Sequence, residues 1–99
     1  MTDAQINLAI AKIEYPDKEV GSLDNGSAFV VYHPRSGVKN YIKYWGDIGP
    51  IIEREKIDLK ALSDGWYAGG YDLGFSARAD TPTKAAALCY LKMKGIDDA

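Results

Sequence analysis

Hydrophobic spacing at the start of the chain predicts a short amphipathic helix. Its apolar residues recur at intervals of three and four positions: Ile6, Ala9, Ile10 and Ile13. Thr2 or Asp3 can act as the N-cap, and Pro16 ends the helix because it cannot continue the hydrogen-bond ladder.

The pattern then changes to that of a β-hairpin. Residues 28–32 combine β-branched and aromatic side chains, which predicts a strand from Ala28 to Tyr32. Residues 24–26 (Asp-Asn-Gly) tolerate the positive φ of a tight turn, so Val20 to Leu23 is the weaker partner strand. Residues 33–45 are rich in turn formers and predict a loop with at most a short extended piece.

A second helix and a β-meander follow. Asp47 can cap this helix, with Pro50 in its first turn, where a missing amide hydrogen costs nothing. Residues 57–62 then alternate, and a turn at residues 63–65 leads into one or two further strands. The glycines at 69 and 70, or the stretch from Asp72 to Gly74, mark a bulge or turn within this meander.

The last helix has the clearest limits, from Thr81 to Lys94. Thr81 is its N-cap, Pro82 takes the first helical position, and Gly95 suits a left-handed C-terminal cap. The fold class predicted from all these elements is α+β, with an antiparallel sheet of three to four strands and about three helices packed mainly on one face. A chain of 99 residues has room for one core, so residues 1–99 are expected to form a single domain.

Lys84, in the first turn of that helix, allows two interpretations. The order of elements resembles a double-stranded-RNA-binding domain, whose last helix offers its N-terminus to phosphates. Such domains place several lysines there, however, whereas here Lys84 stands alone beside three alanines, residues 85–87. Small residues allow close approach of a helix to a sheet, so packing explains the pattern better.

Composition and charge limit the classes of protein to which this chain can belong. Apolar residues make up 46% and charged residues 26%, as in globular proteins. A formal net charge of −2 argues against a protein that coats nucleic acid through bulk electrostatics. Cys89 is the only cysteine, and no signal-peptide pattern or membrane span of about 20 apolar residues is found, so a cytoplasmic protein is expected.

No catalytic or metal-binding constellation emerges from the sequence. One His and one Cys are too few for a zinc site, and no cofactor motif is found. His33 lies beside Pro34 without a nucleophile motif, and Cys89 falls on the apolar side of a helix. We therefore expect a non-enzymatic protein without a cofactor.

One segment, from Tyr32 to Trp45, has the composition of a contact surface. No acidic residue occurs between Asn25 and Gly46, and cations alternate there with aromatic rings. The candidate partner-binding residues are Tyr32, His33, Arg35, Lys39, Lys43, Tyr44 and Trp45. They suit a protein partner, because Tyr, Trp and Arg are common interface anchors, or a nucleic-acid strand, with Lys39 and Lys43 on phosphates. A homodimer that covers the exposed rings is a further alternative.

Three segments carry a family resemblance. An opening helix with Asp3, Ile6 and Asn7, a central Asp-x-Gly-Pro-Ile-Ile at residues 47–52, and a closing Pro-x-basic-Ala-Ala at residues 82–86 resemble the NinX-like proteins of lambdoid bacteriophages. That family has no known function. The resemblance implies a phage or prophage accessory protein in a bacterial cytoplasm, whose partner is a phage or host protein.

Overall fold

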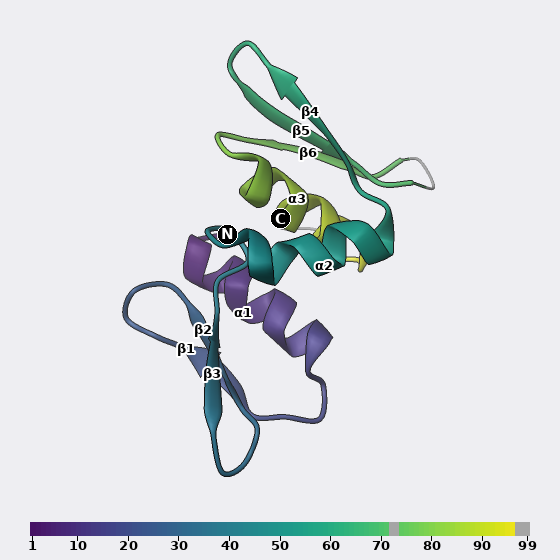
Figure 1. The fold of residues 1–99 in the computed structure, drawn as a ribbon. Coiled ribbons are helices and arrows are strands. Elements are labelled where there is room, and N and C mark those ends of the chain that lie inside the picture. Colours follow the sequence, from purple (N-terminus) through teal and green to yellow (C-terminus); the bar gives the residue numbers. More distant parts are fainter. Residues whose placement is uncertain (72–73, 97–99) are drawn as a thin grey trace.

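The computed structural model describes residues 1–71 and 74–96 and contains three helices and six strands (Figure 1). In chain order the elements are α1 (Asp3–Glu14), β1 (Val20–Ser22), β2 (Ala28–Val31), β3 (Ser36–Lys39), α2 (Trp45–Glu55), β4 (Asp58–Leu62), β5 (Gly65–Gly69), β6 (Ser76–Ala79) and α3 (Pro82–Met93). The expected α+β class is confirmed. The strands form two antiparallel sheets, β1-β2-β3 and β4-β5-β6, each of three strands, where the sequence indicated one sheet. The division arises because α2 intervenes between β3 and β4 and carries the chain away from the first sheet.

The first sheet confirms the predicted hairpin and adds a strand to it. β1 pairs with β2 in the register Val20 opposite Val30, and Gly26 takes a φ of 89° in the turn between them. β3, the short extended piece allowed within the predicted loop, pairs with β2, with Phe29 opposite Val38. Ala28 and Val30 are fully buried, so alternate residues of β2 face α1.

The second sheet confirms the predicted meander, which has three strands where two or three were expected. β4 and β5 form a hairpin in which Leu59 lies opposite Ala68, and Ala68 in turn lies opposite Ala77 of β6. These three side chains share the face that packs against α3. Gly69 and Gly70 fall at the end of β5, while residues 72 and 73 of the second predicted turn lie outside the described residues.

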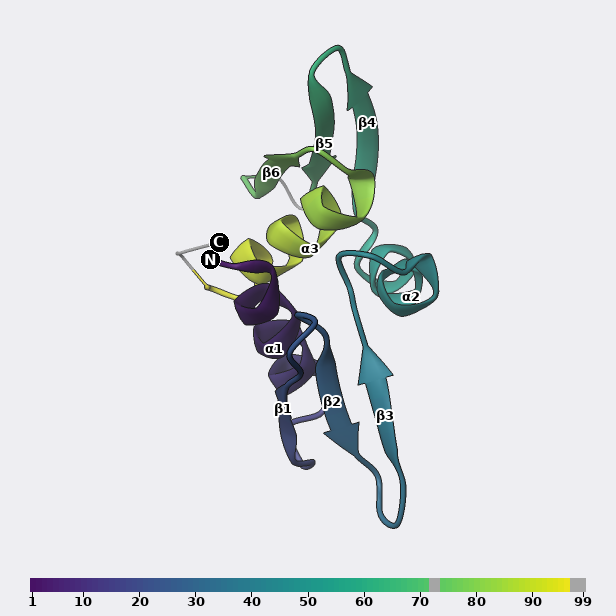
Figure 2. The same ribbon diagram turned by 90° about the vertical axis from the view of Figure 1, so that its left-hand side faces the viewer.

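The helices form a layer between the two sheets (Figures 1 and 2). α1 packs on the first sheet and α3 on the second, and both α1 and α2 contact α3. Figure 1 shows the three helices running in the same general direction, so their N-terminal ends lie together at one side of the layer and their C-terminal ends at the other. None of the helices in the described part of the chain has the length and apolar composition needed to cross a membrane.

The C-terminal helix packs as its alanines predict. Ala85, Ala86 and Ala87 have no solvent exposure, and Cys89 and Leu91 are equally buried. The helix limits are also confirmed: the Thr81 side chain accepts a hydrogen bond from the backbone of Lys84, and Gly95 adopts a φ of 83° just beyond the end.

The start of α2 differs from the prediction. The helix begins at Trp45, two residues before the expected cap at Asp47, and Pro50 therefore falls after the first turn. Asp47 does not cap the helix because its carboxylate has other partners: Oδ2 accepts a hydrogen bond from the backbone N–H of Asn40 at 2.8 Å, and Oδ1 lies 3.7 Å from Lys39 Nζ. The actual N-cap, Tyr44, makes no side-chain hydrogen bond to the first turn.

The C-terminal ends of the three helices are joined by a polar network. Arg54 of α2 donates two hydrogen bonds to the Glu14 carboxylate at the end of α1, at 2.8 and 2.9 Å. The Tyr90 hydroxyl of α3 donates to the same carboxylate. Glu55 accepts a hydrogen bond from Arg54 Nε at 2.8 Å and lies 3.8 Å from Lys94 Nζ. We call these five residues the Glu14 network.

Candidate functional site

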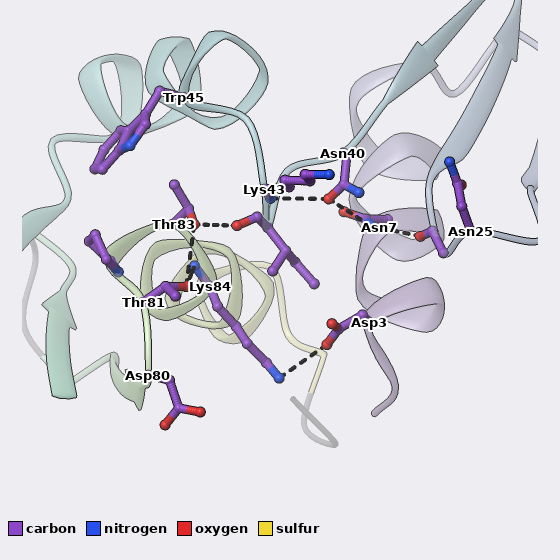
Figure 3. A pocket seen from close by; sticks show the side chains of 13 residues that line it. Asp3, Asn7, Asn25, Asn40, Lys43, Trp45, Asp80, Thr81, Thr83 and Lys84 are labelled. Carbon is purple, nitrogen blue, oxygen red and sulfur yellow. Dashed lines mark hydrogen bonds and ion pairs between the residues drawn. The ribbon is translucent and has the colours of Figure 1, made fainter. Parts of the chain in front are cut away.

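A cleft opens at the opposite end of the helix layer, where the N-terminal ends of the three helices meet. Its volume is about 660 Å³. It is lined by Asp3 and Asn7 of α1, Asn25 and Gly26 of the first hairpin, Asn40, Ile42, Lys43 and Trp45 around the start of α2, and residues 80–84 around the start of α3 (Figure 3). We call this the helix-start cleft. It brings together four stretches of the chain that are far apart in sequence.

The floor of the cleft is built by two buried asparagines, Asn7 and Asn40. Asn7 Nδ2 donates to the Gly26 carbonyl at 2.8 Å and to Asn40 Oδ1 at 3.1 Å, while its own Oδ1 accepts from the Tyr41 N–H at 2.8 Å. Asn40 Nδ2 donates to the Ser27 hydroxyl at 3.2 Å. These bonds fix α1, the first hairpin and the segment that leads into α2 relative to one another.

The side formed by α3 is fixed by the residues of its first turn. The Thr83 hydroxyl donates to the Ile42 carbonyl, which ties the helix to the segment before α2. Lys84 Nζ lies 3.0 Å from Asp3 Oδ1, so these two charges connect the first turns of α3 and α1 (Figure 3). Lys84 is therefore paired with a charge of the same molecule, in an ion pair that is open to solvent on the side of Asp3.

The rim of the cleft includes Lys43 and Trp45, and Tyr44 lies between them in the chain. Tyr44 is 50% exposed and Trp45 is 54% exposed, which is high for such large side chains. Lys43 Nζ lies 5.4 Å from the centre of the Tyr44 ring, and among the described residues it forms no ion pair. One open ring, that of Trp45, and one cation without an ion pair among the described residues therefore border the cleft.

The structure separates the candidate partner-binding residues into two groups. Lys43 and Trp45 border the cleft and Tyr44 lies between them in the chain, whereas Tyr32, His33 and Arg35 lie in the turn between β2 and β3, at the other end of β3 (Figure 1). The charge of Lys39, between these groups, is shared with Asp47. The seven residues thus do not form one continuous surface.

The turn residues have their own contacts. The Tyr32 ring packs edge-on against Tyr15 with the ring centres 5.7 Å apart, and Lys18 Nζ lies 5.8 Å from the Tyr32 ring. The neighbouring Tyr15 side chain raises the pKa of Tyr32 to about 12. Tyr32 is thus held by the end of α1, while His33 and Arg35 are exposed beside it.

Sequence reasoning missed the polar floor of the cleft. Asn7 and Asn40 are 33 positions apart, and no spacing rule links an asparagine on a helix to one in a loop. Asp3 is a possible cap, Lys84 is an isolated lysine and both belong to the family resemblance, but nothing in the sequence predicts that they pair. The three segments of the family resemblance meet here, because Asp3 pairs with Lys84 while Asn7 and Asp47 both bind Asn40.

The remaining reactive groups do not form a chemical site. Within residues 1–71 and 74–96, no three His, Cys, Asp or Glu side chains are grouped to hold a metal ion. Cys89 is fully buried, and burial raises the pKa of its thiol, as expected of a core residue.

In comparisons with protein-family models, with curated proteins and with solved structures, no match to this chain was found.

Proposed function

We propose that this protein is a non-enzymatic module that binds another protein through the helix-start cleft. The observation that carries the proposal is the exposure of Trp45 (54%) at the rim of an open cleft, with the exposed ring of Tyr44 next to it in the chain. Trp and Tyr dominate the energetics of protein interfaces, because they bury a large apolar area at a small cost in side-chain entropy.

The charges of the cleft favour a protein over a nucleic acid. Its lining includes two cations, Lys43 and Lys84, and two acids, Asp3 and Asp80. A polyanion needs an excess of positive charge along its path, which this balanced set does not supply. A protein segment can complement a mixture of charges and rings.

The contacts of the polar groups favour binding over catalysis. The hydroxyls of Thr81 and Thr83 are engaged in hydrogen bonds that hold the start of α3, and His33 lies at the far end of β3. A reaction needs a nucleophile or base that is free to approach a substrate. We place this module among bacteriophage or prophage accessory proteins of the bacterial cytoplasm, on the strength of the family resemblance alone.

Selection from a displayed library of random peptides tests the proposal. Peptides selected on the wild-type protein should bind through Trp45, so Trp45→Ala should weaken them by about 2 kcal/mol or more, roughly thirtyfold. Tyr71→Ala is the matched control, since Tyr71 is 68% exposed and lies away from the cleft. Equal losses in the two variants, or no selected peptide at all, would contradict the proposal.

Weak binding of nucleic acid by the segment from Tyr32 to Trp45 is the alternative, and salt separates the two. The logarithm of the affinity for a labelled strand should fall linearly with the logarithm of salt concentration, with a slope of about −0.7 to −0.9 per phosphate neutralised. The affinity of a protein partner held by aromatic rings should hardly change with salt. Arg35→Ala and Lys43→Ala would each reduce that slope. A homodimer that buries Tyr44 and Trp45 would appear in light scattering as a doubled mass.

A further inference from the structure

The outer face of the second sheet, opposite α3, presents three side chains in one row. Lys60 of β4 lies opposite Tyr67 of β5, and Tyr67 lies opposite Arg78 of β6. The residues next to them in the chain pack against α3, so these three side chains point to the other face. Figures 1 and 2 show all three helices on the α3 side of this sheet. We call these three residues the Tyr67 row.

The ring of Tyr67 lies against the sheet, over Gly69. A Cβ atom at position 69 would lie 3.0 Å from the Tyr67 hydroxyl oxygen and 3.1 Å from its Cε1 atom, so a glycine is needed beneath the ring. Gly69 is buried there, while Tyr67 keeps part of its surface exposed. Among the described residues, no second aromatic ring and no cation is stacked on the Tyr67 ring. Its outward side is therefore open to a stacking partner.

The two charges of the row are positive and exposed. Among the described residues, neither Lys60 nor Arg78 forms an ion pair. Asp58 is the one acidic residue within β4, β5 and β6, and it belongs to the neighbouring row, opposite Gly69. Directly opposite side chains in a sheet have Cβ atoms about 5 Å apart. The register thus places one cation on each side of an aromatic ring.

We infer that this face binds a single nucleic-acid strand, with one base stacked on Tyr67 and the two phosphates that flank its nucleotide on Lys60 and Arg78. A nucleic-acid strand has a phosphate on each side of every nucleotide, so its charges complement the two cations of the row. An acidic protein segment would neutralise the cations but would leave the ring without a flat partner. This site lies on a different surface from the helix-start cleft and does not depend on the proposed function.

Two strands that differ only in their bases test the inference. One is a strand of about six thymidines, and the other has the same length and phosphates but abasic sugars. In titrations of the ¹⁵N-labelled full chain at low salt, followed by NMR, the thymidine strand should produce saturable shifts of the Lys60, Tyr67 and Arg78 amides. The abasic strand should bind about tenfold more weakly or less, because it cannot stack on the ring.

Variants of the ring give a second comparison. Tyr67→Leu keeps an apolar side chain over Gly69 but removes the stacking surface, so it should weaken the thymidine strand by about tenfold and leave the abasic strand unchanged. Tyr44→Leu is the matched control, because Tyr44 is an exposed tyrosine near the helix-start cleft, and it should change neither affinity. An unchanged amide spectrum away from the row verifies the fold of each variant.

Variants of the cations test the phosphate contacts. Lys60→Gln and Arg78→Gln should each reduce the slope of log affinity against log salt by about 0.7, since each removes one phosphate contact. Lys12→Gln changes an exposed lysine of α1 and should leave the slope as it is. All three positions are exposed, so these variants should fold even where Tyr67→Leu does not.

Several results would overturn the inference. Equal affinity for the two strands, equal effects of the two tyrosine variants, or no saturable shift would each do so. Tighter binding of hexaglutamate at the same amides would assign the row to an acidic protein segment. Shifts confined to residues 32–45 would place the nucleic acid on that segment instead. Peptide selection through Trp45 is a separate measurement, so either proposal can fail while the other stands.

Discussion

Asn7 and Asn40 show how two residues can organise a site without belonging to its exposed surface. Each is almost fully buried, and together they satisfy the Gly26 carbonyl, the Tyr41 N–H and the Ser27 hydroxyl. A buried polar group is tolerated only when it is hydrogen-bonded, and a satisfied network defines one geometry. This pair positions the segment at the start of α2 that presents Trp45 to the cleft.

Asn7→Ala should therefore destabilise the fold strongly. It leaves the Tyr41 N–H and the Gly26 carbonyl without this partner and removes one of the two hydrogen bonds that Asn40 Oδ1 accepts, and each buried group costs about 1–3 kcal/mol when unsatisfied. We expect a loss of about 3 kcal/mol or more in urea unfolding. Asn25→Ala, which removes one bond at an exposed position, should cost about 1 kcal/mol or less. Similar losses for the two variants would show that the buried pair is not central.

The sequence identified the exposed residues of the site better than the buried ones. Lys43, Tyr44 and Trp45 are consecutive, so composition alone drew attention to them. Asn7 appeared to be a polar residue of an amphipathic helix, and its role depends on contacts with segments 19 and 33 positions away. Only the tertiary structure brings those partners together.

At the scale of elements, the sequence predicts correctly those helix and strand limits that are determined by interactions between neighbouring residues. Thr81, Pro82 and Gly95 define α3 by capping and backbone conformation, which are properties of neighbouring residues. Asp47 is a good capping residue, yet tertiary contacts with Asn40 and Lys39 take its carboxylate, and α2 starts earlier. β3, with Ser36 and Gly37, has weak strand propensity and exists because β2 offers a free edge.

The packing of α3 supplies an element-scale prediction. Ala86 is fully buried in the helix layer, so Ala86→Leu should force the helix from its neighbours and cost about 1–3 kcal/mol. Ala61→Leu introduces the same side chain at an exposed position of β4 and should be nearly neutral. Thermal unfolding of both variants measures the difference, and a neutral Ala86→Leu would mean that the helix is loosely packed.

At the scale of the whole molecule, the Glu14 network joins the two halves of the protein. It links α1, which packs on the first sheet, to α3, which packs on the second, through Arg54 of α2. Burial alone would raise the pKa of Glu14. Hydrogen bonds from Arg54 and Tyr90, with the positive charges of Arg54 and Lys94, more than offset it and lower the pKa of Glu14 below its ordinary value of 4.5.

This shift predicts acid sensitivity. Because the folded protein binds the Glu14 proton less readily than the unfolded chain does, the stabilisation is present above pH 4.5 and is lost as the pH falls through the lower folded pKa. Urea midpoints measured from about pH 7 to about pH 3 should fall less steeply for Glu14→Gln than for the wild type. Glu53→Gln, at an exposed position of α2, should keep the wild-type slope. Parallel curves for all three proteins would exclude this role of Glu14.

The separation of the two sheets has a consequence for how the molecule opens. In the described part of the chain, no strand pair joins β1-β2-β3 to β4-β5-β6. The two sheets are connected through the helix layer. Fluctuations that expose the amides of one sheet to deuterium need not expose those of the other, whereas loss of the helix layer exposes both. In hydrogen–deuterium exchange, the amides of each sheet should thus exchange independently of the other sheet, and the amides of the helix layer should exchange most slowly.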